Sequence, residues 1–365
     1  MRLIDIPTVI VGAVLVVLPL DAALRSFILP RGVPVSLSRL IVRMVRIVFD
    51  LIARPARDYE ARDRVMALYG PVALLALPAV FMIFIFVGFA CFFQGFDGTG
   101  WGDAFITSGS SLFTLGFLRP PHYALNFLAF LESGLGLTLL ALLISYLPTI
   151  YSAFSRREIA VTGLAVRAGT PPTAWDLLER AHRARFLDQL DQTWEVWELW
   201  FQELSETHTS LSILAFFRSP NPNRSWVTAS GAVLDAAALR YALVDIPWTP
   251  APGLCIRSGY LALREIADFY GIEYDPDPPP DAPISITRDE FEQVYQRLAA
   301  AGVPVRTDRD RSWKEFTGWR VNYDRVLTAL AGLVMAPYAP WSSDRSSRYR
   351  APPLHPRRGR PAGQR

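Results

Sequence analysis

The chain has 365 residues, 51% of them hydrophobic, and its mean hydropathy is +0.21. A formal net charge of +3 is too small to indicate a nucleic-acid partner, and two cysteines with four scattered histidines exclude a cysteine-based metal site. The average hydropathy combines a strongly apolar first part with a far more polar remainder. We therefore expect a membrane part followed by a soluble part.

The first predicted element is an apolar helix within residues 1–24, whose core (residues 6–20) lies between Asp5 and Asp21. This core is short for a bilayer span, which needs about 20 apolar residues at helical rise. It could instead be the core of a signal peptide. Because no convincing small-x-small cleavage site follows it, we predict that it is retained as a signal anchor.

Residues 25–69 form a basic segment, with nine arginines between Arg25 and Arg64 against four acids. Its apolar residues recur at helical spacing, and Arg39, Arg43 and Arg46 lie largely on the opposite face. The apolar residues are Leu37, Leu40, Ile41, Met44, Val45, Val48 and Leu51. A basic amphipathic helix this close to a span favours the lipid interface, with anionic lipids as partners of residues 35–66. The alternative is a soluble helix packed on the cytoplasmic domain.

Two further segments are long enough to span a bilayer. The first, residues 70–93, has no charge, and the second, residues 124–150, has one ionisable residue, Glu132. The basic loop before the first span and the Ser155-Arg156-Arg157 sequence after the second are both cytoplasmic by the positive-inside rule. We therefore predict a multi-pass cell-membrane protein with a cytoplasmic C-terminal domain, in which the stretch between the two spans faces outward.

That stretch, residues 101–119, reads WGDAFITSGSSLFTLGFLR and is predicted to be a short helix between two loops. Polar backbone at membrane depth is tolerated only where protein buries it or water lines it. Ser110 and Ser111 can form hydrogen bonds locally or to neighbouring helices, and the C-terminal end of the helix favours a cation beyond it. Gly116 permits the unusual dihedrals that let consecutive carbonyls point one way, and Thr114 can add its hydroxyl.

These residues resemble the pore loop of the potassium-channel superfamily. Residues 70–158 are similar to the outer helix, pore helix, filter and inner helix of a bacterial two-transmembrane channel. The resemblance implies an all-α membrane protein whose filter carbonyls hold a dehydrated cation. It matches Thr114 to the filter threonine, Leu115 to the valine, Gly116 to the first glycine and Phe117 to the tyrosine. Leu118 stands where the second glycine belongs, so the filter is degenerate.

The residue that follows the filter is Arg119 and not an acid. Four copies of Arg119 in a ring at the outer mouth would repel cations and favour anions. Glu132 is a functional candidate because an unpaired carboxylate inside a membrane is expensive. It could pair with Arg119 behind the filter, as a comparable Arg–Glu brace does in inward-rectifier channels. It could instead bond the hydroxyls between Ser108 and Ser111.

One filter per chain cannot enclose an ion, so a homotetramer follows if the loop is a pore. Gly134, Gly136 and Pro148 are candidate gating hinges, although small residues also permit close helix packing. The expected function is passive ion conduction, with potassium as the permeant ion and no cofactor. The alternatives are a membrane-anchored sensor or interaction protein that kept the scaffold without conducting, and a non-selective or anion pore.

Residues 155–341 are expected to form an all-helical cytoplasmic domain, a coupler or oligomerisation module. We predict one long amphipathic helix from Thr173 to Thr207, with three aromatic residues on one face, and a capping box at Thr287 that opens a helix to about Ala301. The aromatic residues are Trp194, Trp197 and Phe201.

His208 lies among hydroxyl residues, but no glycine-rich elbow or phosphate loop accompanies it. We therefore interpret it as a capping or surface histidine and do not expect an enzyme. Residues 342–365 are rich in serine, arginine and proline, a composition that predicts a disordered tail.

Overall fold

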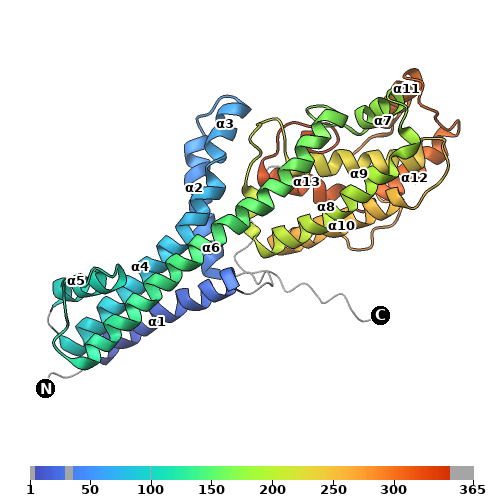
Figure 1. Cartoon of the computed structure of the whole chain (residues 1–365). Helices are drawn as coiled ribbons and strands as arrows, with labels where there is room; N and C mark the ends of the chain where they lie inside the picture. Colours follow the sequence, from blue (N-terminus) through green and yellow to red (C-terminus); the bar gives the residue numbers. More distant parts are fainter. Residues whose placement is uncertain (1–4, 29–35, 99, 346–365) are drawn as a thin grey trace, which may run out of the picture. The chain divides into compact units, whose positions relative to one another are not determined.

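The structure is a computed structural model that describes residues 5–28, 36–98 and 100–345 (Figure 1). Regular structure in these residues is helical, apart from one isolated bridge between Val244 and Val305. This confirms the predicted all-α class. The chain divides into unit 1, Met1–Arg57 with Val65–Ser152, and unit 2, Asp58–Arg64 with Ala153–Arg365.

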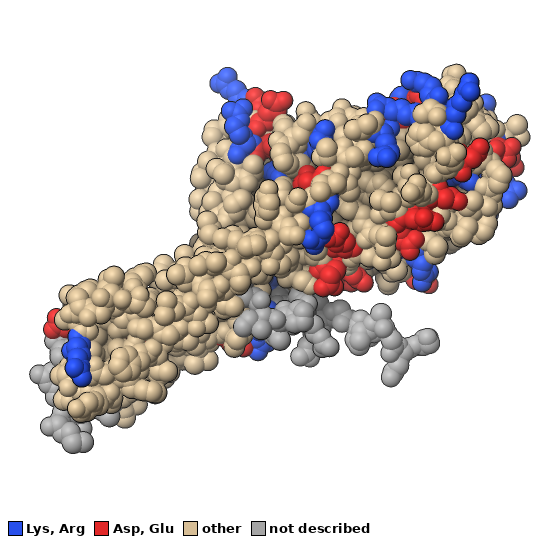
Figure 2. Space-filling view, viewed as in Figure 1, with Lys and Arg blue, Asp and Glu red and all other residues tan. Residues whose placement is uncertain are grey.

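Among the described residues, three helical stretches are long and apolar enough to cross a membrane: Ile6–Ser26, Tyr59–Asp97 and Tyr123–Ala168. The first is longer than its predicted core because a π-helical turn extends it. On the face shown in Figure 2, few charged side chains lie on unit 1 and many lie on unit 2. By length and composition the chain is therefore suited to a membrane, as expected from its apolar runs.

Unit 1 consists of α1 (Ile6–Ala23), the π-helical turn η1 (Leu24–Ile28), α2 (Ser36–Ala53), α4 (Tyr69–Asp97), α5 (Trp101–Leu112) and the first part of α6 (Tyr123–Ala168). Glycines bring α1 close to α4. A Cβ added to Gly12 would lie 2.7 Å from the carbonyl oxygen of Gly88, and one added to Gly88 would lie 2.7 Å from the Val16 side chain. Small residues thus allow two apolar helices to pack backbone to backbone.

Helix α2 is amphipathic, as predicted, and it packs on α4 with Ile41 buried. The Tyr69 hydroxyl at the start of α4 donates to the carbonyl of Val42 at 3.3 Å, and Arg46 lies over the Tyr69 ring. The opposite side of α2 exposes an apolar row. Its members are Leu40, Met44, Ile47, Val48, Leu51 and Ile52. The outward face of this helix is therefore largely apolar, and the arginines flank it, half-buried.

Unit 2 consists of α3 (Tyr59–Met66), the end of α6, α7 (Ala174–Arg183), η2 (Leu187–Gln189), α8 (Asp191–Ser210), η3 (Ser212–Phe216), α9 (Trp226–Ala242), α10 (Ala251–Tyr270), α11 (Arg288–Ala300), α12 (Arg309–Arg320), α13 (Asp324–Val334) and η4 (Ser343–Arg345). Every residue of α9 is buried, so this helix is the centre of the unit. Its Asp235 carboxylate accepts from the buried Arg320 at 2.5 and 2.6 Å and from the Tyr323 hydroxyl at 2.8 Å. The central charge is therefore paired and hydrogen-bonded, as burial requires.

The predicted long helix from Thr173 to Thr207 is wrong, because the chain reverses between α7 and α8. Arg185 has a left-handed backbone with φ 59°, and the Phe186 N–H donates to the Ala181 carbonyl at 3.0 Å. The reversal places Leu187 and Leu190 in the core. The capping box is confirmed: the side chains of Thr287 and Glu290 each accept a hydrogen bond from the other's backbone N–H. The aromatic stripe on α8 is buried, as a core face should be.

The structure moves the boundaries of two predicted segments, the basic segment and the C-terminal tail. Asp58–Arg64, which the sequence places in the basic segment, belongs to unit 2. At the other end, Arg345 in η4 bonds Glu290 at 2.7 Å, so the start of the predicted tail is held on α11. The rest of the predicted tail, residues 346–365, lies outside the described residues.

Candidate functional site

The candidate site is the end of α5 and the loop that follows it, residues 113–122. Helix α5 begins after Gly100 and lies beside the second half of α4 (Figure 1). One aromatic contact attaches its first turns to α4, because the ring centroids of Phe105 and Phe86 are 5.4 Å apart. Within α5, the Trp101 ring centroid lies 6.0 Å from that of Phe105. The expected short helix between two apolar spans is therefore present.

Ser110 fixes the loop to α5 through backbone N–H groups. The N–H groups of Leu115 and Gly116 donate to the Ser110 carbonyl at 2.9 and 3.3 Å. The Leu118 N–H donates to the Ser110 hydroxyl at 3.3 Å. Ser110 is buried, so these bonds close the loop over the C-terminal end of the helix.

The loop backbone is left-handed at two places, Thr114 with φ 56° and Gly116 with φ 69°. Only glycine adopts this region without a steric cost, so the threonine is strained by about 1–2 kcal/mol. Left-handed residues alternating with others turn successive N–H groups to one side. The Thr114 hydroxyl, expected to be free for an ion, donates to the Phe113 carbonyl at 2.7 Å.

The carbonyl oxygens of the same loop have no such partners. Among the described residues, no hydrogen bond reaches the carbonyl oxygens of residues 114–118. Leu115 and Phe117 are 63% and 62% exposed, so the rest of the chain does not cover these two side chains. The loop thus directs N–H groups to α5 and leaves a run of unoccupied acceptors.

Helix α6 contacts α5 through two polar residues. Glu132 is wholly buried, and its Oε1 lies 2.5 Å from the Ser108 hydroxyl, which is also 2.8 Å from the Phe86 carbonyl. The Ser133 hydroxyl donates to the Ser111 carbonyl at 2.6 Å. The sequence interpretation missed Ser133, although a serine directly after an intramembrane glutamate is the signal that would have found it.

The sequence suggested two partners for Glu132, Arg119 and the hydroxyls between Ser108 and Ser111. In the structure Glu132 contacts the Ser108 hydroxyl. Arg119 is exposed, and within the described ranges no ion pair joins it to Glu132. The expected brace between these two residues is therefore absent from this chain. Arg119 instead precedes a turn in which the Asn126 side chain donates to the Pro120 carbonyl at 2.9 Å.

The geometry around Ser108 indicates that the Glu132 carboxyl group is protonated and neutral. A serine hydroxyl has one proton, yet two oxygens lie within hydrogen-bond distance of it. Both contacts are hydrogen bonds when a neutral Glu132 donates to Ser108 and Ser108 donates to the Phe86 carbonyl. A neutral carboxyl also suits a buried position at which no described residue forms an ion pair with Glu132 to compensate a charge.

The three predicted hinge residues differ from one another. A Cβ at Gly136 would overlap the Leu112 carbonyl oxygen, whereas nothing lies within 4 Å of one at Gly134. Pro148 lies inside α6, which continues through it to Ala168 without interruption. Gly136 is therefore a packing position between α5 and α6. Close helix packing, the alternative to a hinge, accounts for the glycine at position 136 but not for Gly134.

The outward face of α6 is largely uncovered. Only 17% of its apolar stretch is buried, against 44% for the stretch that contains α4. The exposed residues recur at alternating spacings of four and three, the pattern of a helix-packing seam. They are Phe130, Gly134, Leu137, Ala141, Ile144, Pro148 and Tyr151. Beside this seam lies a row of hydroxyl groups that bond the carbonyls of their own helix, at Thr138, Ser145 and Thr149.

His208 is not the capping or surface residue that its neighbours suggested. It is wholly buried, with Nδ1 2.9 Å from the Leu204 carbonyl and Nε2 3.2 Å from the Arg157 guanidinium. Its ring packs on Trp226, with centroids 4.8 Å apart. Its partner comes from a distant part of the chain, so the local sequence could not reveal the burial.

Comparisons of the chain with protein-family models, with curated proteins and with solved structures gave no match. In the part of the chain that the structure describes, no three His, Cys, Asp or Glu side chains gather as a metal site requires. Functional inference therefore depends on the geometry of the α5–α6 loop and of α6.

Proposed function

We propose that four copies of this chain form a passive ion pore in the cell membrane, with potassium as the permeant ion. The observation that carries the proposal is the loop at residues 114–118. Its N–H groups turn to Ser110 and Ser111, and its carbonyl oxygens have no hydrogen-bond partner among the described residues. Such a row of oxygens can replace the hydration shell of a cation.

The exposed face of α6 supports the fourfold assembly. Its large residues, from Phe130 to Tyr151, would pack against the next copy, and the hydroxyl row beginning at Thr138 would face the lumen. Closed rotational symmetry is the simplest way to surround an ion with identical loops. Glu132 and Ser133 would then support the loop from behind by fixing α5 to α6.

The exposed apolar row of α2, flanked by half-buried arginines, fits the lipid interface and anionic headgroups. The positive-inside rule supports a cytoplasmic position for unit 2, where it would regulate opening. Neither role requires a cofactor.

The decisive test is potassium flux from liposomes that contain purified protein. We expect a flux that barium blocks, and a Gly116→Ala variant that conducts at least about tenfold less, because a left-handed alanine costs about 1–2 kcal/mol in each subunit. Gly102→Ala is the matched control, since Gly102 is in α5 and nothing lies within 4 Å of its added Cβ. Absence of flux from well-folded tetramers would favour a non-conducting sensor or interaction protein.

A pore with weak or reversed charge selectivity is the second candidate, and Arg119 favours it. This arginine is exposed directly after the carbonyl row, and it forms no ion pair with any described residue. In asymmetric potassium chloride, Arg119→Gln should raise the cation-to-anion permeability ratio by at least about threefold, because a cation at a mouth repels cations. Asp103→Asn, in the first turn of α5, is the control. A reversal potential near that of chloride in the unmodified protein would replace the potassium assignment.

A further inference from the structure

The cytoplasmic end of α6 is fixed by one buried arginine. The Arg157 guanidinium donates to the carbonyls of Leu214 and Phe217 at 2.9 and 2.7 Å and to Glu158 at 2.9 and 3.0 Å. Arg157 is 4% exposed, so these bonds are shielded from water. Charge-assisted bonds in such surroundings are strong and are costly to break.

His208 completes this attachment as a neutral acceptor. Burial and the adjacent Arg157 hold the pKa of His208 well below its usual range. Its Nδ1–H then donates to Leu204, and Nε2 accepts from Arg157. The two charged side chains at the attachment, Arg157 and Glu158, neutralise each other. His208 therefore stays neutral and keeps accepting from Arg157 near neutral pH.

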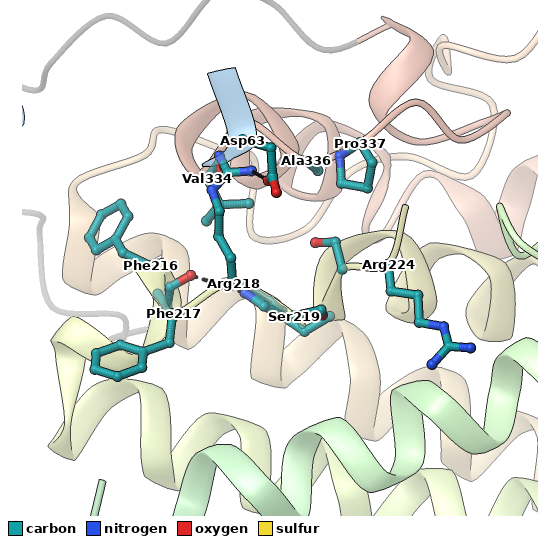
Figure 3. A pocket seen from close by; sticks show the side chains of 12 residues that line it. Asp63, Phe216, Phe217, Arg218, Ser219, Arg224, Val334, Ala336 and Pro337 are labelled. Atoms are coloured by element: carbon teal, nitrogen blue, oxygen red, sulfur yellow. Dashed lines mark hydrogen bonds and ion pairs between the residues drawn. The ribbon is translucent and has the colours of Figure 1, made fainter. Parts of the chain in front are cut away.

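The residue after Phe217 makes the second attachment. Arg218 forms an ion pair with Asp63 of α3, and it also donates to the Tyr59 hydroxyl at 3.1 Å. Its other nitrogen donates to the carbonyls of Val334 and Met335 at 2.7 and 3.1 Å. Figure 3 shows Arg218 reaching toward Asp63, beside a cavity of about 20 Å³ that has room for a single water molecule.

Residues 214–218, which we call the strut, thus touch both chain segments that lead into unit 1. One end holds Arg157 of α6, and the other holds α3, which only Ala67 and Leu68 separate from α4. Both attachments use guanidinium groups, whose fork geometry fixes direction as well as distance.

We propose that the strut couples the cytoplasmic ends of α4 and α6, so that unit 2 moves these helices together. This inference rests on the proposed function, because coupling of the two helices matters for a pore that opens. A change in α8 or η3 would reach α6 through Arg157 and α4 through Arg218. Arg157 and Arg218 are positioning residues in this mechanism.

The test measures whether a change at Arg157 reaches α3, which Arg157 does not contact. In the full-length protein, Arg157→Lys keeps the charge beside Glu158 but removes the guanidinium fork whose two nitrogens bond the Leu214 and Phe217 carbonyls separately. We expect backbone hydrogen exchange in residues 59–66 to become at least about fivefold faster, since charge-assisted bonds are lost. Arg156→Gln, which removes an exposed ion pair with Glu203, should leave this exchange unchanged.

Faster exchange in the strut with unchanged exchange in α3 would overturn the coupling, whether or not the protein conducts. In liposomes, the effects of Arg157→Lys and Arg218→Lys on potassium flux should not add, because both break one linkage. Additive effects would also contradict the strut. If the unmodified protein carries no flux, the pore proposal fails while the exchange result still decides the coupling.

Discussion

Gly136→Ala should separate α5 from α6 and remove potassium flux. The added methyl group would overlap the Leu112 carbonyl oxygen, which is backbone and cannot rotate away. Overpacking of this kind costs about 1–3 kcal/mol and should lower the thermal midpoint by about 5 °C. The measurement is thermal unfolding in detergent, followed by flux from liposomes.

Gly134→Ala is the control on the same helix, two residues away. A Cβ there meets nothing within 4 Å. Exchange of glycine for alanine inside a helix stabilises it by up to about 1 kcal/mol, so the midpoint should hold or rise. If Gly134→Ala stops conduction without changing stability, Gly134 acts as a hinge. Equal behaviour of the two variants would contradict the packing role of Gly136.

The helices of this chain could be predicted because their signals are local. A span requires about 20 apolar residues, and that length can be counted along the sequence. The capping box at Thr287 likewise involves residues three apart. The reversal at Arg185 could not be predicted in the same way, because Leu187 and Leu190 turn into a core built by distant helices. Periodicity continued across that turn and indicated a single helix.

The candidate site was predictable in its residue types and less so in its contacts. Ser110, Gly116 and Glu132 were expected near the loop, and the structure places all three there. The partner of Glu132 depends on how α5 packs on α6, which no local pattern encodes. The same packing distinguishes Gly136 from Gly134, although both are glycines within one apolar run. Long-range packing therefore decides the roles of residues that look alike in the sequence.

Glu132→Gln should be tolerated, whereas Glu132→Ala should not. An amide is nearly the same shape as a carboxyl and can donate to the Ser108 hydroxyl, which then still donates to the Phe86 carbonyl. Alanine leaves a cavity and removes the hydrogen bond that the Ser108 hydroxyl accepts, at a cost of about 2–4 kcal/mol. Thermal midpoints and potassium flux of the two variants provide the comparison.

A double-mutant cycle with Ser108→Ala tests the same bond directly. If Glu132 acts through Ser108, the two alanine variants together should destabilise the protein by about 1 kcal/mol less than the sum of the single variants. Exchanging the charges of Arg119 and Glu132 should rescue nothing, because these residues form no ion pair in the described part of the chain. If Glu132→Gln lowers the thermal midpoint and the flux as much as Glu132→Ala does, Glu132 is an ionised carboxylate with another partner. The neutral form follows from the single proton that Ser108 can donate between two oxygens 2.5 and 2.8 Å away.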